Sequence, residues 1–375
     1  MKGEYKMADT FIDLVDNKGQ AQGVVANSLQ NNGNLNIGRM RPFIAEDGQA
    51  YISSYKGYGD PKVAENWVLN QINTNALLRR DEWKQLDDVL IEVGRQRMGG
   101  IEDLISKGLV YNLGNAMGTT VLEWHDVSDG FEAIVSMDAV TRSKNDKVTF
   151  SHNYLPIPII HSDYEINART LATSRNMGNG VDTISAANAA RKVKQTLEDM
   201  LFTNVTYSFG EKDARNRNSI YSYVNHPDRN QVTLSLAWTD PTKTPAQILA
   251  DVQKMKAAAL AALKFGPYQI YIPTAYDAVL DNDYNVAGQS VLTIRERLMK
   301  LDGITGIKVV DTLPANNVLL VQMTSDVVRL VRGMDLQNVE WGVEGNMITK
   351  YKVMTIQVPQ IRSDGNGKSG VVHMA

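Results

Sequence analysis

The sequence contains no cysteine among its 375 residues. This excludes disulfide bonds, thiolate nucleophiles and thiolate metal ligands. Charge of one sign is not in large excess either, because 39 Lys and Arg residues face 42 Asp and Glu residues and the formal net charge is −3. Proteins that wrap nucleic acid usually carry a strong basic excess, so we expect any contact with DNA to be local or weak.

Long hydrophobic runs are also missing. The first 16 residues, MKGEYKMADTFIDLVD, contain no apolar core of a secretory signal. The most apolar helical stretch, AAALAALKF at 257–265, is far shorter than the roughly 20 residues of a membrane span. We therefore expect a soluble protein with no recognisable export signal and no membrane partner.

The motifs of common enzyme classes are absent as well. The five histidines have no metal-ligand spacing, and no G-x-S-x-G motif is present. Residues 365–370, GNGKSG, resemble the end of a phosphate-binding loop, but Arg362 stands where the first glycine belongs and only five residues follow. We interpret this segment as a flexible tail and predict no catalytic residue, no cofactor and no metal site.

The first 75 residues differ in composition from the rest of the chain. They are rich in Asn, Gln, Gly and Ser and show no sustained apolar period. This composition favours an extended arm over a packed domain. Fully extended, such an arm could span about 250 Å. We therefore expect its partners to be other chains.

A helix is predicted over 77–93, LLRRDEWKQLDDVLIEV, followed by a short one at 101–108 that Gly108 ends. The apolar side of the first helix is formed by Leu78, Trp83, Leu86, Leu90 and Val93. Its polar side is predicted to present acidic residues, namely Asp81, Glu82, Asp87, Asp88 and Glu92.

Between about 118 and 160 the apolar pattern changes to period two, which predicts a long two-stranded hairpin. Its strands are expected at 131–139 and 147–154, and its tip, TRSKNDK at 141–147, is charged. A lone hairpin is marginally stable in water, so something outside it must support it. Pro156 and Pro158 remove two N–H donors from one edge. This segment is therefore either a protected edge strand or a bridge between the hairpin and the body.

The clearest helical pattern of the chain covers 182–202, DTISAANAARKVKQTLEDMLF, about 30 Å long. Asp182 or Thr183 is expected to cap it. Its predicted buried stripe consists of Ile184, Ala187, Ala190, Val193, Leu197, Met200 and Leu201. The polar, turn-rich residues 205–243 that follow are interpreted as a connector.

Residues 244–335 alternate between helical and strand patterns, which predicts a compact α/β domain. Thr244 followed by Pro245 is a typical helix start. Residues 347–363 form another long strand, which we expect to return to the earlier β structure.

The order of these blocks resembles the tailed-phage major capsid proteins, and among them the subgroup close to encapsulins. The similarity rests on YLPIPIIHSDYEINARTL, DTISAANAARKVKQTLEDMLF, SYVNHPDRNQVTL and KFGPYQIYIPTAYDAVL and covers roughly residues 75–362. The resemblance implies an α+β chain with the tailed-phage major capsid fold. Its parts would be an N-terminal arm (1–75), the first helices of a peripheral domain (76–117), an extended β-hairpin loop (118–155), the peripheral domain with a spine helix at 182–202 (156–243), an inserted α/β axial domain (244–335), and a return strand with a C-terminal tail (336–375).

The resemblance also implies a function. The chain would be a structural protein, not an enzyme, that assembles with itself into hexamers and pentamers of an icosahedral shell around double-stranded DNA. It would be found in the virion and, during assembly, in the host cytoplasm; scaffold, portal and decoration proteins are further candidate partners. An encapsulin-like compartment and a soluble enzyme with an unrecognised site are the alternatives, and the long arm favours the viral shell.

The hairpin tip and the first helix carry opposite charges. On the family's plan the hairpin lies over a neighbouring subunit. We therefore predict that Arg142, Lys144 and Lys147 of the tip meet acidic residues of a neighbour, for which the candidates are Asp87, Asp88 and Glu92.

Overall fold

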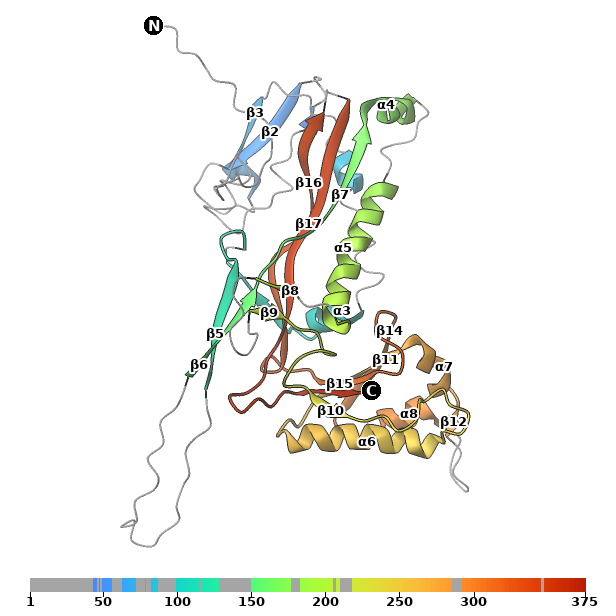
Figure 1. Cartoon of the computed structure of the whole chain (residues 1–375). Helices are drawn as coiled ribbons and strands as arrows, with labels where there is room; N and C mark the ends of the chain where they lie inside the picture. The colour runs from blue at the N-terminus through green and yellow to red at the C-terminus, as the bar shows by residue number, and fades with distance from the viewer. Residues whose placement is uncertain are drawn as a thin grey trace, which may run out of the picture.

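Figure 1 shows the computed structural model of the whole chain. The structure describes residues 43–45, 47, 49–55, 63–71, 78, 82–86, 99–114, 116–127, 150–176, 183–204, 207–209, 218–284, 292–344 and 347–375.

The body of the molecule is built on a four-stranded sheet with the strand order β4-β16-β17-β7. These strands are β4 (Val110–Asn112), β16 (Val328–Glu344), β17 (Ile348–Ile361) and β7 (Ile160–Asn167). The two longest, β16 and β17, pair antiparallel from Val328↔Ile361 to Glu344↔Ile348, with three register shifts. The predicted return strand is thus confirmed, since β17 pairs with β7 of the earlier β structure.

Helix α5 (Ile184–Phe202) runs along this sheet (Figure 1). Its buried face is formed mainly by alanines at the amino end and by larger residues at the carboxyl end, as the sequence pattern predicts. Three details of the prediction are wrong. Ile184 is 69% exposed, and Ala187 is half-buried whereas Ala186 and Ala189 are buried. The side chain of Thr183 makes no capping hydrogen bond. Short helices flank α5, namely α3 (Gly99–Ser106) and α4 (Ala168–Asn176).

A second sheet of five strands has the order β10-β18-β15-β11-β14. Its strands are β10 (Asn230–Val232), β18 (Val371–Met374), β15 (Val318–Gln322), β11 (Tyr268–Pro273) and β14 (Ile304–Val310). Its helical elements are α6 (Pro245–Ala261), η3 (Thr274–Tyr276), α7 (Asp277–Leu280) and α8 (Ile294–Met299). Between α7 and α8 lies a two-stranded ribbon, β12 (Asp283–Tyr284) with β13 (Leu292–Thr293).

Helix α6 starts as its sequence predicts. The side chain of Thr244 accepts a hydrogen bond from the backbone of Gln247, whose own side chain bonds back, and Pro245 occupies the first turn. This is a complete capping box. The predicted connector at 205–243 contributes more than a link, because Trp238 is 1% exposed and packs in the same core as Val252 of α6.

The C-terminal tail differs from the prediction. Residues 371–374 form β18, which is paired on both sides: parallel to β10 and antiparallel to β15. Val371 and Val372 are fully buried. The interpretation of the last residues as a flexible tail is therefore wrong, because they complete the core of the five-stranded sheet.

The predicted arm is also more structured than expected. Three of its segments form an antiparallel sheet, β1 (Phe43–Ile44), β2 (Ala50–Tyr55) and β3 (Trp67–Gln71). Phe43 packs in a core cluster with Leu78, Trp83 and Tyr351. The prediction of an extended arm without packing is thus wrong for Phe43–Ile44, Ala50–Tyr55 and Trp67–Gln71, and residues 1–42 lie outside the described part of the chain.

Residues 82–86 are helical, as predicted. Trp83 and Leu86 are buried and Lys84 is exposed, as the amphipathic pattern requires. Glu82, however, is only 5% exposed, so its assignment to the polar side of the helix is wrong. The next turn, where the pattern continues, lies outside the described residues.

The hairpin projects from the body as a two-stranded ribbon (Figure 1). β5 (Val121–Val127) pairs antiparallel with β6 (Phe150–Pro156), and residues 128–149 are not described. Beyond Pro156, the Ile157 N–H donates to the Thr120 carbonyl at 2.8 Å, and β7 then begins at Ile160. The two prolines therefore lie where the hairpin joins the four-stranded sheet, which confirms the bridge interpretation.

Candidate functional site

The six residues predicted to contact a neighbour all lie outside the described part of the chain. They are Arg142, Lys144 and Lys147 of the hairpin tip and Asp87, Asp88 and Glu92 of the first helix. Their contacts therefore stay a prediction. The described residues instead reveal the two junctions that hold the candidate assembly surfaces in place.

The first junction is the foot of the hairpin, which encloses a cavity of about 480 Å³. Its walls come from β5 and β6, from a small ribbon formed by β8 (Tyr207–Ser208) with β9 (Ser219–Ile220) and the chain after it, and from the carboxyl end of β17 with the loop that follows. The lining includes Trp124, Tyr154, Tyr221 and Ile361. The indole N–H of Trp124 is buried and has no acceptor among the described residues. A cavity therefore separates part of the hairpin base from the body of the same chain.

The second junction connects the two sheets through α3. Asp103 of α3 is 4% exposed at its side chain and forms an ion pair with Lys308 of β14. The Tyr271 hydroxyl of β11 donates to the same carboxylate at 3.0 Å. Beside this group, Lys107 Nζ donates to Gln269 Oε1 at 3.0 Å. We call Asp103, Lys308 and Tyr271 the junction cluster, because they join a helix packed on the four-stranded sheet to two strands of the five-stranded sheet.

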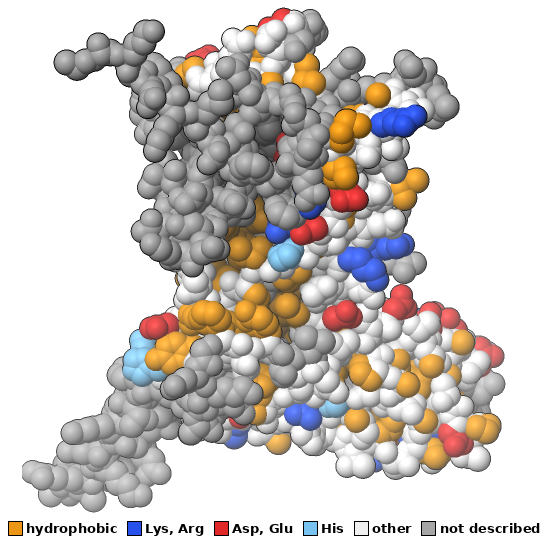
Figure 2. Space-filling model, turned by 45° about the horizontal axis from the view of Figure 1, so that its top comes forward, with side chains coloured by type: hydrophobic (Ala, Val, Ile, Leu, Met, Phe, Trp, Pro, Cys, Tyr) orange, Lys and Arg blue, Asp and Glu red, His pale blue; other side chains and the backbone are white. Residues whose placement is uncertain are grey.

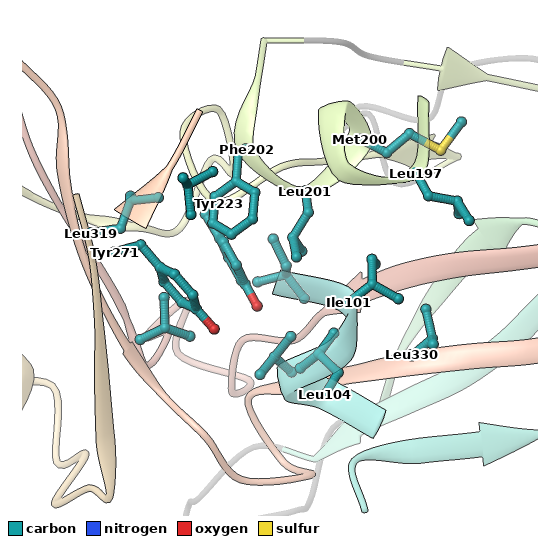
Figure 3. Packing of buried hydrophobic residues seen from close by; sticks show 14 of the residues in the cluster. Ile101, Leu104, Leu197, Met200, Leu201, Phe202, Tyr223, Tyr271, Leu319 and Leu330 are labelled. Carbon is teal, nitrogen blue, oxygen red and sulfur yellow. The ribbon is translucent and has the colours of Figure 1, made fainter. Parts of the chain in front are cut away.

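Apolar packing surrounds the junction cluster. Figure 3 shows Ile101 and Leu104 of α3 packed near Leu201 of α5, in the same cluster as Tyr271. The rings of Phe202 and Tyr271 meet edge to face, with centroids 5.0 Å apart. α3 can approach this closely because Gly100 has no side chain, since a Cβ there would lie 2.3 Å from Phe202 Cε2. The junction is therefore rigid and depends on a glycine.

Two carboxyl groups and two histidines are among the buried titratable groups with shifted pKa values. Burial raises the pKa of Glu198 to about 7, although its carboxylate accepts a hydrogen bond from the Gly100 N–H at 3.0 Å. Burial also raises the pKa of Glu340 to about 7. In the opposite direction, burial lowers the pKa of His226 and of His373 to about 4 each. At neutral pH both histidines are therefore uncharged, and both carboxyl groups are close to their midpoints.

The described residues contain no group of three or more His, Cys, Asp or Glu side chains that could hold a metal ion. No helix of the described part is long and apolar enough to cross a membrane. His125 and His152, which face each other across β5 and β6, form an edge-to-face ring contact at 4.4 Å between centroids. The described residues therefore provide two packed junctions, at the hairpin base and at the junction cluster, and exposed surfaces that could contact other molecules.

Sequence reasoning missed the junction cluster. Asp103 and Tyr271 are 168 residues apart, and no local pattern pairs them. Glu198 could have been noticed, because an acidic residue at this position adjoins the apolar stripe of α5 between Leu197 and Leu201.

Comparison with known proteins gives one family and several structures. Residues 72–374 match the "Family of unknown function (DUF6260)". No curated protein matches the sequence. Among solved structures, the chain is similar to a virus-like particle from Pyrococcus furiosus, with 19% identity and a TM-score of 0.55 over 78% of this chain and 98% of that chain.

Two phage-type capsids are similar as well. The capsid of Myoviridae phage XM1 matches with 10% identity and a TM-score of 0.56 over 74% of this chain and 92% of that one. The capsid of the native GTA particle matches with 12% identity and a TM-score of 0.51 over 75% of this chain and 91% of that one. With TM-scores above 0.5 at these low identities, the matches show a common fold.

Proposed function

Since the chain belongs to the family of unknown function DUF6260 and has the tailed-phage major capsid fold, we propose that it is the major capsid protein of a tailed phage. In this role it assembles with itself into hexamers and pentamers of an icosahedral shell that encloses double-stranded DNA. The single observation that carries the proposal is the fold, since the likeness spans 92% of the XM1 capsid chain.

β5 and β6 pair only with each other among the described strands. A two-stranded ribbon alone is at best marginally stable in water, and at its base Leu122, Trp124 and Leu155 pack on the body of the same chain. We propose that in a closed shell a neighbouring copy adds further support to the ribbon. We assign the four-stranded sheet with α5 to the peripheral domain and the five-stranded sheet to the axial domain.

The same fold supports a second candidate function, a protein compartment of the encapsulin type. The observation that favours it is the likeness to the Pyrococcus furiosus particle, which covers 98% of that chain. Either function is structural, and neither needs a catalytic site. Expression of the full chain followed by negative-stain electron microscopy tests both, because each predicts closed particles. Nuclease-protected double-stranded DNA inside native particles supports the capsid, whereas particles that hold a cargo protein and no DNA support the compartment.

The charged hairpin tip is proposed to fasten neighbouring copies. Exposed ion pairs are worth roughly 0–1 kcal/mol each, but in a shell they recur at every contact. Reversing Lys144 and Lys147 to Glu should weaken assembly while leaving the subunit folded. Reversing Asp87 and Asp88 to Lys in the same chain should restore it. Unchanged sedimentation of assembled particles in the first variant would show that the tip is only solvated.

A further inference from the structure

Helices α4 and α5 present an exposed face on which basic and amide side chains predominate, with the exposed Ile184 at the start of α5. Helix α4 has no acidic residue, and the only acids of α5 are Glu198, which is buried, and Asp199, both in its last turn. We call the exposed polar residues of this surface the α4–α5 face, namely Arg169, Asn188, Arg191, Lys192, Gln195 and Thr196. Figure 2 shows Lys and Arg side chains over both helices on one side of the molecule.

The positive charges of this face are only partly balanced within the described part of the chain, where the charge of Lys192 acts on the carboxyl group of Asp199. Arg191 donates to the neutral Asn188 side chain at 3.0 Å, and Lys192 donates to the neutral Gln195 side chain at 3.3 Å. Neither forms an ion pair with a described residue.

Several basic residues of the five-stranded sheet domain form ion pairs. Lys243 lies 2.6 Å from a carboxylate oxygen of Asp251, and Arg295 pairs with both Asp277 and Asp281. That domain also exposes acidic side chains, such as Asp283. The α4–α5 face therefore carries a local positive charge that the formal net charge of −3 conceals.

The composition of this face selects a polyanion over a protein as its partner. Between Asn188 and Thr196 every exposed residue is polar. Protein interfaces generally have an apolar centre, which is missing here. Arginine, lysine and the amide side chains are instead the usual donors to phosphate oxygens. This part of α5 is about 12 Å long, a length over which duplex DNA presents several phosphates.

We propose that the α4–α5 face binds the phosphate backbone of double-stranded DNA and is the part of the shell that touches the packaged genome. The inference rests on the proposed capsid function. Because contacts to phosphates carry no sequence information, binding is expected to be independent of sequence and to weaken as salt rises.

The test compares two double variants of the full chain. Arg191→Gln with Lys192→Gln removes two charges from the α4–α5 face. Lys254→Gln with Lys300→Gln removes two exposed charges from the five-stranded sheet domain and is the matched control. Fluorescence anisotropy with a labelled duplex, measured on dissociated subunits at several salt concentrations from 20 mM upward, gives the slope of log affinity against log salt.

Each lost phosphate contact reduces this slope by about 0.9 for duplex DNA, so the first variant should lose about 1.8 and the control nothing. Equal slopes for the first variant and the wild type, equal losses in both variants, or no binding of the duplex by the wild type would each overturn the proposal. Electron microscopy of the same proteins separates this inference from the capsid function. The first variant should still form normal particles. A wild type that forms no particles would contradict the capsid function, and the anisotropy result would then decide alone whether the α4–α5 face binds DNA.

Discussion

Replacing Asp103 by asparagine tests whether the junction cluster joins the two sheets. The substitution keeps the shape of the side chain but removes the charge that pairs with Lys308 and turns one acceptor into a donor. A hydrogen bond to a charged group is worth about 1.5–3 kcal/mol. Lys308 is 44% exposed at its side chain and can regain water, which keeps the cost below the 3–5 kcal/mol of a stranded buried charge. We therefore expect the free energy of unfolding to fall by about 2–3 kcal/mol.

The matched control is Asp163→Asn, the same chemical change on the surface. Asp163 is 42% exposed and lies 3.3 Å from His161 and 3.7 Å from Lys352. Exposed pairs of this kind contribute about 0–1 kcal/mol. Urea-induced unfolding of dissociated subunits, followed by circular dichroism, measures both variants. Equal losses in the two variants, or a loss below about 0.5 kcal/mol for Asp103→Asn, would refute the role of the junction cluster.

Three further predictions follow from the packing, the buried charges and the N-terminal sheet. Gly100→Ala should lower the free energy of unfolding in urea by about 1–3 kcal/mol, because its Cβ would overlap Phe202. Gly114→Ala, whose Cβ would meet nothing within 4 Å, should be neutral. Equal costs in the two variants would contradict the close approach of α3. Because the pKa of Glu198 is raised to about 7, its contribution to stability is greatest below about pH 4.5 and is lost as pH rises through 7. The free energy of unfolding of Glu198→Gln, relative to that of the wild type, should therefore be about 2 kcal/mol higher at pH 7 than at pH 5. The same pH dependence in both proteins would count against this. Deleting residues 1–42 should leave the thermal unfolding temperature of the subunit nearly unchanged and impair assembly, whereas a deletion through residue 71 removes β1–β3 and should lower that temperature clearly; normal particles from the shorter deletion would rule out a role in assembly.

The wild-type pH profile should be shallow for a related reason. The lowered pKa values of His226 and His373, about 4, mean that the unfolded chain binds protons first as pH falls below about 6.5. Their contribution to stability therefore increases from pH 4 to 6.5, a range that overlaps the one from about pH 4.5 to 7 in which Glu198 and Glu340 lose theirs. The two contributions to the slope of the free energy of unfolding against pH therefore largely cancel. When one carboxyl group is removed, the contribution of the histidines is no longer offset.

Local signals in the sequence predicted the elements that depend on local chemistry. The capping box at Thr244 defines the start of α6, and the small-to-large stripe defines the buried side of α5. The prolines at 156 and 158 indicated either a protected edge strand or a bridge between hairpin and body, and the structure places them at the bridge. Each of these features depends on residues a few positions apart, where propensity and periodicity act.

Elements that depend on distant partners were not predictable. The four residues of β18 become a strand only between β10 and β15, which start 141 and 53 residues earlier. In β16 the polar residues Asp335, Gln337 and Asn338 interrupt the apolar–polar alternation that is typical of a strand. The strand continues through them because it stays paired with β17, with shifts of register. Glu82 was placed on the polar face of its helix because the helical period cannot show which further segment covers that face.

The most direct test of the central claim is negative-stain electron microscopy of the purified full chain, combined with nuclease treatment and extraction of protected nucleic acid from native particles. The capsid account predicts closed icosahedral shells built from hexamers and pentamers, with double-stranded DNA inside the native particles. A protein that stays monomeric under all assembly conditions would contradict it.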